Sequence, residues 1–165
     1  MTTKPLPSIE LLRELFSYDP ETGLLTRKIS LGSRGMCGCV AGSLNNLGYL
    51  TVGILGRKIG VHRVAWAIHF GAWPVNDIDH KDGVKSHNWV QNLRDVTADV
   101  NIQNRKSAQT NNKTGLLGVS PNRARFSASI KNMGVKVHLG TYNTPEEAHA
   151  VYLKAKRELH LGCTI

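Results

Sequence analysis

The sequence is poor in acidic residues. Its 165 residues include 12 Asp and Glu against 21 Lys and Arg, and the formal net charge is +9. A chain with so few carboxylates favours a polyanionic partner, and a nucleic acid is a stronger candidate than an acidic membrane surface. Nucleic acid binding is therefore the first functional expectation, although charge alone does not identify the partner.

Cysteine is also scarce. The chain has three cysteines, Cys37, Cys39 and Cys163, and an odd number with one Cys-Gly-Cys pair does not indicate a disulfide framework. A zinc site at Cys37 and Cys39 would need two further ligands, and the spacing differs from the usual two to four intervening residues. We therefore expect reduced thiols and no zinc.

Long hydrophobic runs are absent from the sequence. No apolar stretch approaches the length of a membrane span, and Met1 to Pro5 lead into no apolar core of a signal peptide. We therefore expect a cytoplasmic protein without a membrane partner.

A polar stretch divides the chain. Residues 107–114 are rich in turn-forming residues and nearly free of apolar side chains, which is typical of a linker. We predict a first domain at 1–107 and a second at 108–165, each with a modest core. Apolar spacing and turn signals in the first domain predict a helix at 5–17, strands at 24–27, 49–55 and 59–61, a mobile glycine-rich loop at 31–42, and helices at 62–70 and 98–106.

The second domain has the pattern of a small α+β module. Three short strands separated by turns are followed by Thr144-Pro145-Glu146-Glu147, a capping box with proline at the first helical position. Apolar residues then recur at helical spacing, and Gly162 stands where the helix would stop. We predict a three-stranded antiparallel sheet packed on one helix, with strands at 116–119, 124–131 and 135–142.

Four polar residues of the first domain can support phosphodiester chemistry. A hard cation needs oxygen ligands, which Asp79 and Asn101 can supply, and attack by water needs a base such as His80. Asp79 and His80 end a predicted strand, so their side chains point to opposite sides. The side-chain amide of Asn92 can hydrogen-bond to the loop between the two strands and so position His80. Taken alone, the Asp-His pair favours a plainer interpretation, as the entry to a turn, and only the complete set of four residues favours a site.

The surrounding motifs resemble those of the HNH homing endonucleases of phages. The resemblance covers about residues 9–106, and it implies a ββα-metal nuclease fold. It also implies that Asp79 and Asn101 bind one divalent metal ion, Mg²⁺ or Mn²⁺, that His80 is the general base, and that Asn92 is the structural asparagine. Val84 and His87 depart from the family pattern in the loop. The residues that carry the resemblance are Ile78 to Gly83, Asn88, Asn92-Leu93-Arg94, Val96-Thr97, Asn101 and Asn104, with Tyr18 to Gly23, Gly48-Tyr49-Leu50 and Val61-His62-Arg63 upstream.

Residues 113–161 resemble the Apetala-two (ethylene-response-factor) DNA-binding domain of plants. The family implies a sheet that lies in the major groove with the helix packed behind it. Plant tryptophans and much of the plant arginine are missing here, so phosphate contacts would dominate over base reading. A solvated basic face is the alternative. The residues that match are Gly115, Gly118-Val119, Phe126 to Ala128, Val137 to Tyr142 and Thr144 to Ala148.

Strand alternation predicts which side chains of this sheet face DNA. Basic and polar residues occupy one face, and Phe126, Ala128 and Ile130 occupy the other, against the helix. The DNA contacts expected on the sheet are Arg123, Arg125, Ser127, Ser129, Lys131, Lys136 and His138.

Three arginines outside the sheet, Arg63, Arg94 and Arg105, are further candidate DNA contacts. His62-Arg63 begins a predicted helix and is read equally well as a phosphate contact or as a structural pair. His69 lies among apolar residues, so we interpret it as a core histidine.

These observations together predict a metal-dependent DNA endonuclease of the phage homing type. It would leave 5′-phosphate and 3′-hydroxyl ends, nick or cut both strands of double-stranded DNA, and need no small-molecule cofactor. We expect a monomer, with a dimer possible on DNA. The alternatives are a catalytically inactive, sequence-tolerant DNA-binding protein and an RNA-directed binder.

Overall fold

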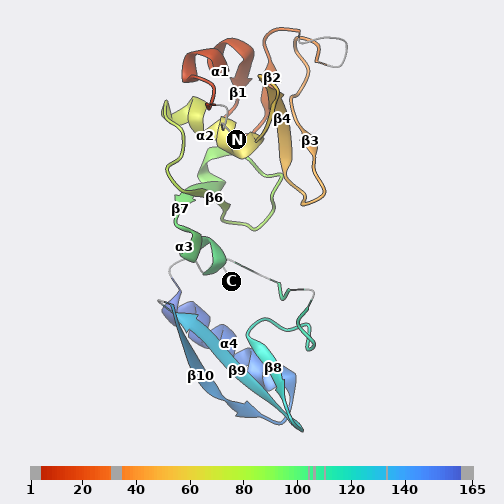
Figure 1. The fold of residues 1–165 in the computed structure, drawn as a ribbon, viewed down its shortest axis with the longest axis vertical. Coiled ribbons are helices and arrows are strands. Elements are labelled where there is room, and N and C mark those ends of the chain that lie inside the picture. Colours follow the sequence, from red (N-terminus) through yellow and green to blue (C-terminus); the bar gives the residue numbers. More distant parts are fainter. Residues whose placement is uncertain are drawn as a thin grey trace. The chain divides into compact units, whose positions relative to one another are not determined.

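The computed structural model describes residues 5–30, 35–103, 105, 107–109, 111–132 and 134–160 (Figure 1). The predictions made for Asn104, Lys106, Gly162, Cys163 and the first part of the loop at 31–42 lie outside these residues. Helices and strands are mixed, as the α+β prediction requires. No helix of the described residues is both long and apolar enough to cross a membrane.

The chain divides into two compact units between Asp95 and Val96. The domain boundary at residue 107, which follows the sequence motifs, stays a prediction.

The first unit begins with helix α1 (Ile9–Leu15), which Ser8 caps by accepting a hydrogen bond from the N–H of Leu11. This capping satisfies one of the free amide groups at the helix start. Two antiparallel strands follow, β1 (Phe16–Tyr18) and β2 (Leu25–Arg27). Leu12 and Phe16 are fully buried and join these elements to the main core of the unit.

A three-stranded antiparallel sheet comes next, with β4 (Leu50–Ile54) between β3 (Ser43–Leu44) and β5 (Arg57–Gly60). The sequence does not predict β3, because its two residues are both exposed and carry no apolar alternation. On β4, Val52 and Ile54 point into the core.

Helix α2 (Val61–Phe70) buries Val61, Val64, Ala65 and Ala67 and ends at Gly71, which adopts the left-handed conformation that favours glycine. The interpretation of His69 as a core histidine is wrong, since the residue is exposed. It lies in the last turn, where its ring contacts Phe70 edge to face instead of entering the core.

Strand β6 (Asp77–His80) pairs with β7 (Leu93–Val96), and the one-turn 3-10 helix η1 (Val90–Asn92) leads into β7. Ile78 and Leu93 form a small buried cluster with Ala65 of α2. This apolar contact fixes the strand pair against α2 and so determines where the polar residues of β6 point.

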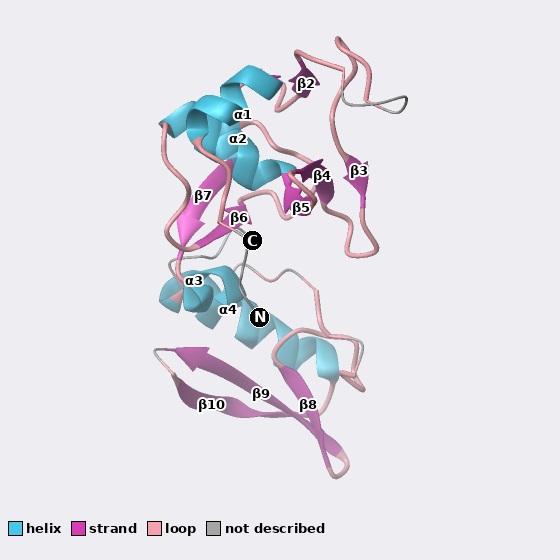
Figure 2. Cartoon of the chain, turned by 45° about the horizontal axis from the view of Figure 1, so that its top comes forward, coloured by secondary structure: helices cyan, strands magenta, loops and turns pink. Residues whose placement is uncertain are grey.

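The second unit contains α3 (Ala98–Gln103) and a three-stranded antiparallel sheet in the order β10 (Val135–Tyr142), β9 (Arg125–Asn132), β8 (Val119–Asn122). Helix α4 (Pro145–Leu159) lies along one face of this sheet (Figure 2). Val119, Ala128 and Ala148 are the buried core between them. The capping box of Thr144 and Glu147 is formed, as the sequence predicts.

Strand β8 begins at Val119, three residues later than the sequence predicts. The segment before it forms a hydrogen-bonded turn around Asn112 and Thr114. The amide of Asn112 donates to the carbonyls of Leu116 and Val119, at 2.9 and 3.3 Å. These bonds take the place of strand pairing at Leu116.

Candidate functional site

Asp79 and His80 lie side by side at the end of β6 and are almost completely buried, with 7% and 3% of their surface exposed. Consecutive strand residues point to opposite sides, so the carboxylate and the imidazole are separated by the strand. On one side the Asp79 carboxylate accepts from Arg94 of β7, with Oδ2 2.6 Å from Nη2 and 2.8 Å from Nε. Arg94, predicted to contact DNA, is therefore directed at this carboxylate.

On the other side, Nε2 of His80 lies 3.1 Å from the amide oxygen of Asn88. Burial lowers the pKa of His80, and this effect outweighs the hydrogen bond to Asn88 and the charges of Asp82 and Asp79, which raise it. The imidazole is therefore neutral near neutral pH, which is the form that can accept a proton.

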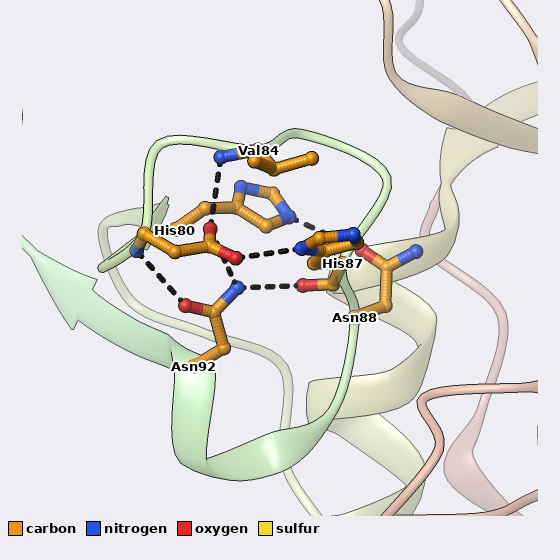
Figure 3. A network of polar contacts seen from close by, with 6 residues as sticks. His80, Val84, His87, Asn88 and Asn92 are labelled. Atoms are coloured by element: carbon orange, nitrogen blue, oxygen red, sulfur yellow. Dashed lines mark hydrogen bonds and ion pairs between the residues drawn. The ribbon is translucent and has the colours of Figure 1, made fainter. Parts of the chain in front are cut away.

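Asn92 spans the loop between the strands. Its amide oxygen accepts from the N–H of Asp82 at 3.0 Å, and its amide nitrogen donates to Asp82 Oδ1 at 3.0 Å and to the carbonyl of His87 at 2.8 Å. The close view of this network shows both ends of the loop joined through Asn92 (Figure 3). Lys81 N–H also donates to the carbonyl of Asn92 at 2.9 Å.

Asp82 is the second residue that holds this loop through several hydrogen bonds, and its role was not predicted from the sequence. It accepts from the N–H of Val84 at 2.8 Å and pairs with His87, at 2.7 Å from Nδ1. Burial raises the pKa of Asp82, but the hydrogen bonds from His87, Val84 and Asn92 together lower it. The Asp82-Gly83 dipeptide is a turn signal that could have indicated this position.

A cluster of rings surrounds the imidazole of His80. The ring of His62 lies 5.3 Å from it and 5.2 Å from the ring of Tyr49, measured between centroids. Burial, the neighbouring His80 and Arg63 lower the pKa of His62 to about 4. The His62 ring folds back over Gly60, where an added Cβ would lie 2.5 Å from its Cε1 atom, so any side chain at this position would displace the ring.

Arg63 makes contacts within its own unit. Its guanidinium donates to the carbonyl of Asn76 at 3.1 Å and to that of Pro74 at 3.5 Å. These bonds hold the segment that enters β6, and a role of Arg63 in DNA binding stays a prediction.

The donor atoms proposed for the metal ion are oxygens, which fits a hard divalent cation. Asp79 supplies a buried carboxylate whose charge Arg94 balances. Asn101 lies half-buried in α3 of the second unit, and its pairing with Asp79 stays a prediction. Among the described residues, no three His, Cys, Asp or Glu side chains gather as a metal cluster. Cys37 and Cys39 are exposed free thiols.

The outer face of the sheet in the second unit has the predicted alternation. Ala128 and Ile130 are buried, whereas Arg125 and Lys131 are exposed. Cross-strand partners share a face, and the register pairs Lys131 with Lys136 and Ser129 with His138. We call this surface the basic face; its residues are Arg125, Ser127, Ser129, Lys131, Lys136 and His138.

Arg123 and Arg105 lie beside the basic face in different surroundings. Arg123 is exposed in the turn between β8 and β9 and has a positive φ of 54°. Arg105 lines an open cleft of about 590 Å³ together with Lys113 and Lys136. Among the described residues that line this cleft, none carries a carboxylate.

Comparisons with known proteins bear on the first unit and the residues that follow it. A family model described as HNH endonuclease matches residues 60–103, the segment from the end of β5 to the end of α3. DNA endonuclease I-HmuI of Bacillus phage SP01 is 40% identical over 91 residues, which are 52% of this chain and 47% of that protein.

The chain thus spans about half the length of this curated relative. No solved structure matches significantly. The matched segment contains the four residues singled out from the sequence, Asp79, His80, Asn92 and Asn101. Residues 60–103 are therefore similar to HNH endonucleases, and the matched segment includes both strands that carry the candidate site.

Proposed function

We propose that the protein is a metal-dependent DNA endonuclease that hydrolyses phosphodiester bonds to 5′-phosphate and 3′-hydroxyl ends. One observation carries the proposal: within the segment that matches HNH endonucleases, a neutral, buried His80 lies next to the buried carboxylate of Asp79. Hydrolysis of a phosphodiester needs a base for the attacking water and a metal ion on the phosphoryl oxygens. His80 can be the base, and Asp79, on the other side of the strand, can supply an oxygen ligand for the metal ion.

His80 would take the proton of the attacking water, because its imidazole is neutral and held by Asn88. Asp79 and Asn101 would hold one divalent ion, Mg²⁺ or Mn²⁺. When bound, such an ion supplies positive charge to the phosphoryl oxygens and to the departing 3′ oxygen. Asn92 keeps the loop that follows His80 closed through three hydrogen bonds.

The second unit would bind the double-stranded substrate. Between residues 107 and 165 there are eight Lys and Arg against three Glu, and the exposed ones of β9 and β10 gather on the basic face. The cleft lined by Arg105, Lys113 and Lys136 offers further cations to a phosphate backbone. We propose binding as an Apetala-two-like module, with one active site per chain and a monomer as the nicking species.

Supercoiled plasmid tests the nuclease directly. With Mg²⁺ or Mn²⁺ the protein should produce nicked or linear plasmid, and a chelator should abolish both products. His80→Ala should lose at least about 100-fold in rate, the order that general-base catalysis contributes. A wild-type protein that leaves the plasmid intact with every metal, yet still shifts duplex DNA, would instead be the inactive DNA-binding protein.

A further inference from the structure

A turn near the start of the chain contacts the loop that carries Asn88. The hydroxyl of Tyr18 donates to the carbonyl of Asn88 at 2.7 Å, and the N–H of Val90 donates to the carbonyl of Pro20 at 3.0 Å. The turn is itself held by Asp19, which accepts from the N–H of Glu21 at 2.9 Å. The turn from Tyr18 to Gly23, which we call the buttress turn, therefore clamps the backbone on both sides of Trp89.

Gly23 makes this contact a close one. It has a φ of 74°, and an added Cβ would lie 2.4 Å from the nitrogen of Trp89 and 2.5 Å from the carbonyl carbon of Asn88. Both neighbours are backbone atoms, which cannot rotate away as a side chain can. Any other residue at position 23 would therefore push the Asn88 segment outward.

The Asn88 side chain is 2% exposed, and its amide oxygen lies 3.1 Å from Nε2 of His80. An amide oxygen only accepts hydrogen bonds, so Nε2 must carry the proton of the neutral imidazole. The other ring nitrogen, Nδ1, then has the lone pair. The hydrogen bond thus determines which atom of His80 can receive a proton.

Only one half of the Asn88 amide has a partner. The amide nitrogen of Asn88 is buried and finds no hydrogen-bond partner in the described part of the chain. The amide oxygen is the acceptor for the buried ring of His80, and an apolar side chain at this position would leave Nε2 of His80 without it.

We propose that Asn88 is a positioning residue for the general base. Its amide oxygen accepts from Nε2–H and so fixes the orientation and the tautomer of the His80 ring, and the buttress turn holds Asn88 in place. The consequence for catalysis rests on the proposed nuclease function. The tautomer and the contacts of Asn88 do not depend on that function.

Nitrogen-15 NMR of the metal-free full chain reports the tautomer without any turnover. Long-range proton–nitrogen correlations of the histidine rings, assigned with His80→Ala, should show His80 protonated at Nε2. Asn88→Leu should lose this preference, whereas Asn88→Asp, which keeps an acceptor, should retain it. A wild-type His80 protonated at Nδ1, or an Asn88→Leu variant with an unchanged tautomer, would overturn the proposal.

Plasmid nicking then tests the positioning role. Asn88→Leu should lower the single-turnover rate at saturating enzyme about 100-fold, as loss of a general base would, with little change in DNA affinity. Asn88→Asp should recover a large part of that rate. If Asn88→Leu cuts like wild type while His80→Ala does not, Asn88 has no part in orienting the base.

The buttress turn has a matched control in the second unit. Tyr18→Phe and Tyr142→Phe each remove one tyrosine hydroxyl that donates to a backbone carbonyl, at 2.7 Å to Asn88 and at 2.9 Å to Leu139. Tyr18→Phe should slow nicking about tenfold, which is the order expected when a supporting hydrogen bond is lost. It should also disturb the His80 tautomer. Tyr142→Phe should do neither. Equal rates for the two variants would refute the role of the turn.

The two proposals can fail separately. A wild-type protein with His80 protonated at Nε2 that cuts no plasmid would refute the nuclease and leave the positioning by Asn88 intact. A protein that cuts plasmid with His80 protonated at Nδ1 would refute the positioning and leave the nuclease intact.

Discussion

Arg94 and Asp79 form a partly buried ion pair across β6 and β7, with Nη2 of Arg94 2.6 Å from Oδ2 of Asp79. The carboxylate proposed to bind a metal ion therefore has a positive charge beside it within the protein itself. Removal of the guanidinium would take this charge away from an almost buried carboxylate, which is destabilising.

We predict that Arg94→Leu lowers the free energy of unfolding by roughly 2 kcal/mol, less than for a fully buried pair, because the nearly buried carboxylate of Asp79 loses the cation beside it. Addition of Mg²⁺ should raise the melting temperature more in this variant than in wild type, since the cation then replaces the lost positive charge. Thermal unfolding with and without Mg²⁺ measures both effects. Lys58→Gln, at an exposed cation of β5, is the control, and an equal response of the two variants would contradict the prediction.

The pH dependence of stability should report the buried His62. Its pKa is about 4 in the folded protein against 6.5 ordinarily, so the folded state disfavours the charged form. The contribution of the neutral His62 to the free energy of unfolding is therefore fully present above about pH 6.5 and is lost as the pH falls toward 4. The loss is at most about 3 kcal/mol, since one pKa unit corresponds to about 1.4 kcal/mol.

Denaturant unfolding across this pH range measures the effect, and His62→Gln, which cannot titrate there, should flatten the curve. His69→Gln, at an exposed histidine of the same helix, is the matched control for the loss of one imidazole. A His62→Gln curve as steep as that of wild type would be inconsistent with a neutral His62.

The pH dependence of cleavage should report His80. Burial lowers the pKa of His80, so the neutral base is present at a lower pH than for an ordinary histidine. The nicking rate should rise with pH through a value below 6.5, the ordinary histidine pKa, and then level off. Single-turnover rates at fixed metal concentration give the profile, and a limb centred above the ordinary value would contradict this prediction.

Asn92→Ala should open the loop between β6 and β7. The substitution removes the acceptor of the Asp82 N–H and both donors from the Asn92 amide, so we expect a loss of about 2 kcal/mol in stability. Hydrogen exchange at the Asp82 N–H should accelerate in the variant. Asn46→Ala, in the exposed turn before β4, is the control, and equal protection of Asp82 in both variants would count against the loop assignment.

Salt dependence tests the basic face. Lys131→Gln should reduce the slope of log affinity against log salt by about 1, because one phosphate contact is lost. Lys154→Gln removes the same charge from the exposed side of α4 and should leave the slope unchanged. Fluorescence anisotropy with a short duplex over a salt series measures both, and equal slopes for the two variants would show that DNA does not lie on this face.

Elements with strong local signals were predictable from the sequence. Helix α2 ends at Gly71 and helix α4 begins at the capping box of Thr144, and both boundaries lie where the sequence puts them. The alternation along β9 also predicts which side chains are buried, because a strand with one covered face has a period of two.

Contacts between distant segments were not predictable. Nothing local to Tyr18 indicates that its hydroxyl reaches Asn88, seventy residues later in the chain. The sequence likewise gives no sign that Arg94 turns toward Asp79, since an exposed and a paired arginine have the same local pattern. Such relations depend on how α2 and the strand pair pack, which periodicity does not encode.

The turn around Asn112 and Thr114 affects how this protein could be recombined with others. The polar stretch that was predicted to be a linker ends in side chains that hold β8, the first strand of the C-terminal sheet. Grafting this sheet and α4 onto another catalytic module through a glycine-serine spacer in place of residues 107–114 would discard these bonds. A chimeric protein that keeps these bonds would need its fusion point upstream of Asn112, so that the turn is transferred together with the sheet.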